Sequence, residues 1–215
     1  MPAKQPSPRV KTLPKASRRK GLDRTLILEE ARKLADRVGA AGLSITRLAD
    51  RLGVTPPSLY AHFAGLPELR RELALRGYRE LTQCMIQGGF GLAGEEALFA
   101  VCNAYLQWIR ESPGLYSAII ALSHLQDPKL KEAAADWIGV LYRALSFYGF
   151  TQEELVHASR GLRSIVHGFG SLERGGSFVV PVDRNESFRR MLHSFIKGLG
   201  ETSAVSTRAR SRSLI

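Results

Sequence analysis

The stretch LSITRLADRLGVTPPSLYAHF, residues 43–63, decides how the chain is organised. Ser44 is a typical helix N-cap, and the apolar residues behind it share one side of a short helix. Gly53 stops that helix and Thr55 caps the next one. Pro56 takes the first helical position, where its missing N–H costs nothing. Two short helices joined by so tight a turn predict a helix-turn-helix, whose second helix enters the major groove of DNA.

The rest of the chain also has the spacing of amphipathic helices. Caps and breaks predict helices over 24–38, 44–52, 56 to about 61 or 63, 67–87, 95–111, 113–124, 128–148, 152–173 and 185–199. Thr151 and Glu154 form a capping box before the eighth of these. Because strand periodicity is almost absent, we predict an all-α fold of about nine helices.

Four glycines between residues 88 and 94 mark a boundary. The run Gly89-Phe-Gly91-Leu-Ala-Gly94 matches a dinucleotide-binding fingerprint, but that fingerprint follows a strand, and here a helix precedes it. We therefore interpret it as a linker. The predicted organisation is a disordered basic arm (1–21), a helix-turn-helix DNA-binding domain with a connecting helix (22–87), a ligand-binding and dimerisation domain (88–200) and a disordered basic tail (201–215).

The net charge of +11 is concentrated in these two ends. Residues 1–20 hold seven basic side chains and no acid, and residues 201–215 hold three arginines against one glutamate. A cationic end raises non-specific DNA affinity by releasing counterions. A merely solubilising end fits each segment equally well.

Several classes of protein are excluded or disfavoured. No apolar run approaches the ~20 residues that span a bilayer. Cys84 and Cys102 have no metal or redox spacing, and the five histidines form no catalytic metal motif. We expect a cytoplasmic, nucleoid-associated protein with no membrane partner, no metal and no cofactor. An α-helical enzyme is disfavoured, and a nucleic-acid binder that relies on its basic ends is a third hypothesis.

Residues 24 to about 82 resemble the DNA-binding domain of the TetR/AcrR family of regulators. The turn at Gly53-Val54 and the ending Leu59-Tyr60-x-His62-Phe63 carry the resemblance. The resemblance implies that four residues lie at or near base edges: Thr46, Thr55, Pro56 and Pro57. It implies that five residues hold phosphates: Ser44, Arg47, Ser58, Tyr60 and His62.

One position departs from the family pattern. Most members have a phosphate-binding lysine at the start of the next helix, where this chain has Leu66. Arg70 or Arg71, one turn further on, could replace it, as could the cationic N-terminal arm. The consecutive prolines also leave few hydrogen-bond donors for direct base readout, so their rings are expected to contact thymine methyl groups.

The second half resembles a family subgroup whose last two helices carry a His-Gly-Phe motif. The matching segments are 167–169, 171–173 and 186–188. The resemblance implies a ligand-binding domain and pairing of the last two helices into a four-helix bundle with a second copy. Part of the apolar face of each of these two helices must still pack against the core of its own subunit. The predicted interface residues are Leu162, Phe169, Leu172, Phe188, Met191, Leu192 and Phe195.

The central helices are rich in aromatic residues, which form either a core or the wall of a cavity for an apolar or aromatic effector. The candidate effector-binding residues are Asn103, Tyr105, Trp108, Tyr116, His124, Trp137, Arg163 and His167. For Arg163 the simpler alternative is an ion pair with a neighbouring acid, and for His167 a structural hydrogen bond. Together these features predict a ligand-responsive, homodimeric regulator, most often a repressor in this family, on a pseudo-palindromic DNA site.

Overall fold

The computed structural model describes residues 21–123 and 126–212, with side chains as far as Glu201. Within these ranges the regular structure is entirely helical, so the prediction of an all-α fold with nine helices is confirmed. The helices are α1 (Arg24–Val38), α2 (Ile45–Leu52), α3 (Pro56–Tyr60), α4 (Leu66–Gly88), α5 (Gly94–Glu111), α6 (Pro113–Leu122), α7 (Pro128–Leu145), α8 (Gln152–Arg174) and α9 (Arg184–Arg212), with a 3₁₀ turn η2 (Ser146–Tyr148) after α7. None of these helices has the length and hydrophobicity that crossing a membrane requires.

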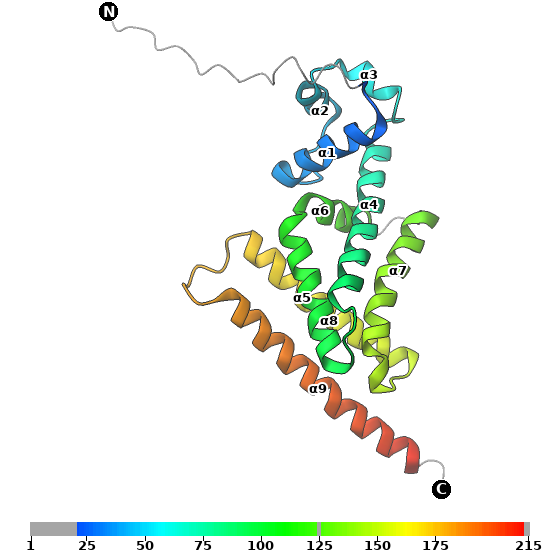
Figure 1. The fold of residues 1–215 in the computed structure, drawn as a ribbon, viewed down its shortest axis with the longest axis vertical. Coiled ribbons are helices and arrows are strands. Elements are labelled where there is room, and N and C mark those ends of the chain that lie inside the picture. Colours follow the sequence, from blue (N-terminus) through cyan, green and yellow to red (C-terminus); the bar gives the residue numbers. More distant parts are fainter. Residues whose placement is uncertain (1–20, 124–125, 213–215) are drawn as a thin grey trace, which may run out of the picture.

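Figure 1 shows α1, α2 and α3 gathered into a lobe at one end of the long helix α4. The other helices pack around the rest of α4, with α6 next to the lobe, and α9 lies along one flank. The first turns of α4 bury Leu69 and Leu73, and its later turns bury Tyr78, Leu81 and Met85. One continuous helix therefore contributes to the core of both parts, which makes α4 a rigid connection between them.

The predicted caps explain where three of the described helices, α1, α2 and α8, begin. The Asp23 side chain accepts a hydrogen bond from Leu26 N at 2.7 Å, and Ser44 Oγ accepts one from Arg47 N at 3.2 Å. The capping box that begins at Thr151 is also present. Each of these side chains satisfies a first-turn N–H that has no partner inside its helix.

Thr55 occupies the predicted N-cap position of α3, but its side chain does not cap the helix. The next two residues are prolines without an N–H, and the N–H of Ser58 already donates to the Thr55 carbonyl at 3.0 Å. With no donor left for it, the Thr55 hydroxyl pairs with the Ser58 hydroxyl at 3.0 Å. The predicted side-chain cap is therefore wrong, although the start of the helix is right.

Two helix ends differ from the predictions. The segment 146–148 forms η2 instead of continuing α7, and Gly149, at φ +64°, ends it. Helix α9 passes through Gly200, which has no positive φ, and continues to Arg212. The part of the expected disordered tail between residues 201 and 212 is therefore helical. The expected N-terminal arm falls almost wholly on residues 1–20, outside the described residues.

Candidate DNA-binding surface and effector cavity

Helices α2 and α3 form the helix-turn-helix. Gly53 adopts left-handed φ and ψ of 67° and 33°, and Val54 N donates to Ala49 O at 3.1 Å across the turn. Leu48, Ala49 and Leu59 are at most 1% exposed, so they anchor both helices to the core of the lobe. The opposite face of the pair is consequently held in a fixed orientation toward solvent.

The predicted DNA-binding residues fall on this outward side or at its edge. Five of them are exposed: Thr46, Arg47, Thr55, Pro57 and Tyr60. Four are half-buried: Ser44, Pro56, Ser58 and His62. Tyr60, at 56% exposure, is an aromatic side chain left open at the end of α3, which suits a contact to a phosphate. Contacts of these residues with DNA remain predictions.

Neither arginine suggested as a replacement for the missing lysine is free. Arg70 donates to Ala41 O at 3.1 Å and so supports the loop before α2. Arg71 forms two hydrogen bonds to Asp127, at 2.5 and 3.1 Å, next to the start of α7. This pairing lowers the pKa of Asp127 to about 2. A phosphate contact of either arginine, in place of a lysine at position 66, would compete with these contacts and stays a prediction.

Arg24 holds the beginning of α1 against the end of the helix-turn-helix. Its guanidinium donates to His62 O at 2.7 Å, pairs with Glu68 at 2.8 Å and lies 4.2 Å from the centre of the Phe63 ring. Sequence reasoning missed this contact, since the partners are about forty positions apart and nothing local connects them.

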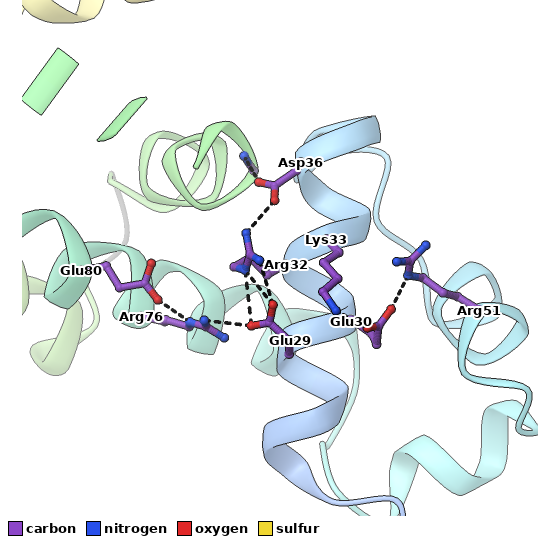
Figure 2. A network of polar contacts seen from close by, with 9 residues as sticks. Glu29, Glu30, Arg32, Lys33, Asp36, Arg51, Arg76 and Glu80 are labelled. Carbon is purple, nitrogen blue, oxygen red and sulfur yellow. Dashed lines mark hydrogen bonds and ion pairs between the residues drawn. The ribbon is translucent and has the colours of Figure 1, made fainter. Parts of the chain in front are cut away.

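A network of charged residues joins the lobe to the rest of the molecule (Figure 2). Arg32 bonds Glu29 at 2.8 Å and Asp36 at 2.9 Å, all three on α1. Arg76 of α4 reaches the same Glu29 at 2.9 Å and also Glu80 at 2.6 Å. The hydrogen bond from Arg32, with a further one from Arg76, lowers the pKa of Glu29 to about 2.

Helix α6 begins directly against the end of α1. The N–H of Gly114 donates to Asp36 Oδ1 at 2.9 Å, and the N–H of Ala40 donates to Ser117 Oγ at 2.9 Å. Asp36 thus satisfies a first-turn donor of a helix far from it in sequence, where a negative charge is also favourable. A Cβ on Gly114 would lie 2.4 Å from backbone atoms of Ala35 and Asp36, so only glycine permits this approach.

A cavity of ≈ 310 Å³ lies between α4, α5, α6, α7 and α8. The structure brings five predicted effector residues together in its wall: Tyr105, Tyr116, Trp137, Arg163 and His167. The wall also contains seven residues that sequence reasoning missed: Tyr78, Leu81, Ile119, Ile120, Ser123, Arg160 and Ser164. Helical periodicity identifies buried faces, but it does not show which parts of those faces remain unfilled.

Three predicted effector residues lie elsewhere. Asn103 is exposed, donates to Phe99 O at 2.9 Å and borders a separate depression near Phe188. Trp108 is buried outside the cavity wall, and its ring forms a T-shaped pair with that of Tyr116. His124 lies outside the described residues. The prediction that these residues bind the effector is therefore corrected: Asn103 is a surface residue and Trp108 a core residue.

Three polar side chains of the cavity form a short chain of hydrogen bonds. Tyr105 and Tyr116 have hydroxyls 3.4 Å apart, and Tyr116 OH lies 2.6 Å from Nδ1 of His167. Burial raises the pKa of Tyr116, and that of Tyr105 well above its usual value, so both are neutral phenols at pH 7. The structural hydrogen bond expected for His167 is present.

Arg163 stacks on Trp137, with its guanidinium carbon 4.9 Å from the ring centre. The alternative in which Arg163 pairs with a neighbouring acid is wrong, because no described carboxylate forms an ion pair with it. The stack on the indole face accounts for its position, since a guanidinium is attracted to the π-electrons of the ring.

The last two helices expose only part of their apolar stripes. Four of the predicted interface residues are buried inside their own subunit and are corrected to core residues: Leu162, Phe169, Phe188 and Leu192. Leu172 and Met191 are 49% and 38% exposed, and Phe195 is half-buried. The interface prediction failed at these four positions because the apolar side of a helix packs first against the core of its own subunit.

Known proteins resemble this chain in sequence and in fold. The model of bacterial regulatory proteins of the tetR family matches residues 27–73, and that of the tetracycline repressor-like C-terminal domain matches residues 98–195. The uncharacterised HTH-type transcriptional regulator YobS of Bacillus subtilis is 34% identical over 184 residues, 85% of this chain and 95% of the relative.

The uncharacterised HTH-type transcriptional regulator Rv0681 of Mycobacterium tuberculosis is 31% identical over 179 residues, 83% of this chain and 82% of the relative. The crystal structure of the TetR family regulator PfmR from Thermus thermophilus has a similar fold, with a TM-score of 0.61 at 22% identity. The match covers 81% of this chain and 98% of that one.

Proposed function

The chain belongs to the TetR family of bacterial DNA-binding transcriptional regulators, which are not enzymes, and from this premise we propose that it is a ligand-responsive repressor. It acts as a homodimer on a pseudo-palindromic operator, and a small apolar or aromatic effector releases it. The observation that carries the proposal is the fixed outward face of α2 and α3, with Tyr60 open at its end.

DNA recognition by this face combines two kinds of contact. Arg47 and Tyr60 hold phosphates, which sets the position of α3 on the duplex. Thr55 and the rings of Pro56 and Pro57 lie at base edges, where the rings meet thymine methyl groups. With few donors on α3, the shape of the DNA contributes to specificity.

Dimerisation uses the part of α8 and α9 that the subunit core leaves open. Leu172 and Met191 are exposed there, and a Cβ on Gly168 would meet no atom within 4 Å beyond its chain neighbours and the nearby backbone of α8. Phe195 packs over Gly161, whose added Cβ would lie 2.2 Å from the ring. Small and apolar residues on two adjacent helices suit a four-helix bundle with a second copy. Such a dimer presents two α3 helices to two half-sites.

Effector release follows from the place of α6. Its residues Tyr116, Ile119 and Ile120 line the cavity, while its first turn docks on α1 through Gly114 and Asp36. An effector that prefers one position of α6 therefore favours one position of the DNA-binding lobe.

Selection of bound duplexes from a random pool, followed by affinity measurement on the selected site, tests the proposal. We expect a pseudo-palindromic site, salt-sensitive affinity, and binding about tenfold or more weaker for Tyr60→Ala, since a hydrogen bond to a charged group is lost. Tyr142→Ala, a half-buried tyrosine on α7, is the control and should bind like the wild type. Equal affinity for all duplexes, unchanged in Tyr60→Ala, would contradict the proposal.

A further inference from the structure

The wall of the ≈ 310 Å³ cavity contains positive charge and hydrogen-bond donors but no acid. Arg160 and Arg163 both belong to it, and none of its twelve lining residues is an aspartate or glutamate. Across the part of the chain that the structure describes, neither arginine forms an ion pair. Arg160 is exposed to solvent, whereas Arg163 is half-buried and stacks on Trp137, so an anion bound in the cavity would compensate the partly desolvated charge of Arg163.

A second donor in the wall also lacks an acceptor. The indole N–H of Trp137 is buried, and no described residue accepts its hydrogen bond. Buried donors are nearly always satisfied, so an ordered water or a bound molecule is expected to accept this hydrogen bond. The phenols of Tyr105 and Tyr116, kept neutral by burial, add further donors nearby.

From this arrangement we propose that the effector is a compact aromatic carboxylate, whose anionic group pairs with Arg163 and whose ring lies among Tyr105, Tyr116 and Trp137. This inference rests on the proposed function, since it names the chemical class of the effector for the same cavity. Carboxylate geometry matches the two parallel N–H donors of a guanidinium.

The size and lining of the cavity favour a compact aromatic ring as the apolar part of the ligand. Its ≈ 310 Å³ lies at the lower end of the range for small-molecule sites, which favours a compact molecule. Tyr78, Tyr105, Tyr116 and Trp137 offer ring surfaces for stacked or edge contacts with an aromatic ring. Leu81 and Ile119 complete an apolar wall that a strongly hydrated ligand would not fill well.

The test compares matched pairs of probes that differ in charge alone. Benzoate with benzamide, and 1-naphthoate with 1-naphthamide, are titrated into the full chain by isothermal titration calorimetry, and DNA release is followed by fluorescence anisotropy. The proteins are the wild type, Arg163→Gln, Arg163→Lys and the control Arg79→Gln. The control removes the same charge from an exposed position of α4 outside the cavity.

In the wild type we expect one carboxylate to bind about tenfold to a hundredfold more tightly than its amide, as a charged hydrogen-bond pair implies. Arg163→Gln should abolish this preference while leaving the amide within about threefold. Arg163→Lys should retain part of it, and Arg79→Gln all of it. A folded Arg163→Gln with the preference intact would overturn the inference. Equal affinities of a carboxylate and its amide in the wild type would also overturn the inference. So would the absence of binding by all four probes at 1 mM.

The outcomes also separate this inference from the proposed function. If amides and carboxylates bind equally and both release DNA, the effector-released regulator stands and the anionic class is wrong. If the protein selects no DNA site in the absence of probes, the proposed function fails whatever the cavity binds.

Discussion

Replacing Gly114 by alanine tests whether the docking of α6 on α1 stabilises the molecule. A Cβ at this position would lie 2.4 Å from the backbone of Ala35 and Asp36, whereas ordinary contact begins near 3.4 Å. Because both obstacles are backbone atoms, α6 has to move away by about 1 Å. The hydrogen bond from Gly114 N to Asp36, now 2.9 Å, would then exceed bonding range.

The loss of this charge-assisted bond, together with residual crowding, should cost about 2–3 kcal/mol. For a chain of this size that lowers the melting temperature by about 4–12 °C. Thermal unfolding followed by circular dichroism at fixed protein concentration measures the change. Gly139→Ala is the matched control, since its Cβ would meet only the tip of Arg143 at 3.5 Å. The control should be neutral or stabilised by up to about 1 kcal/mol, because alanine favours a helix. A Gly114→Ala protein that melts no lower than the control would refute the role of this contact.

Three further predictions concern the lobe. Ser44→Ala should destabilise the protein by about 1 kcal/mol in urea unfolding, whereas Thr55→Ala, which removes no cap, should cost less; equal costs would contradict the assignment of the caps. The free-energy difference between the wild type and Glu29→Gln should be fully present above pH 4.5 and disappear as the pH falls toward 2, because the folded-state pKa lies below the ordinary value; a pH-independent difference in urea unfolding would exclude this. Arg47→Ala should weaken binding to all duplexes alike and reduce the salt slope by about one; an effect confined to one base pair would instead indicate base readout.

The sequence was most informative where the structure depends on neighbours along the chain. The starts of α1 and α2 follow from local spacing and from the caps Asp23 and Ser44, and these predictions are confirmed. The turn at Gly53 was also recognisable, since its conformation is one that glycine adopts easily.

Contacts between distant segments were not predictable in the same way. The pairing of Arg71 with Asp127 joins positions 56 residues apart, and no local pattern distinguishes it from a free arginine. The same limit applies to the apolar stripes of α8 and α9. Leu162 and Leu172 both fit a helical repeat, but the first is fully buried in its own subunit and the second is half exposed. Only the packed structure separates a core stripe from a face left for a partner.

The two prolines at the start of α3 have a thermodynamic consequence for DNA binding. Their rings fix φ at two successive residues, so this tip loses little conformational entropy when it meets a duplex. If the rings cover thymine methyl groups as proposed, apolar surface leaves water, and the heat-capacity change of binding is negative. The binding enthalpy then becomes more favourable on warming, while the salt dependence arises mainly from the phosphate contacts. A protein that reads DNA through Pro56 and Pro57 is thus expected to have a temperature signature separate from its ionic one.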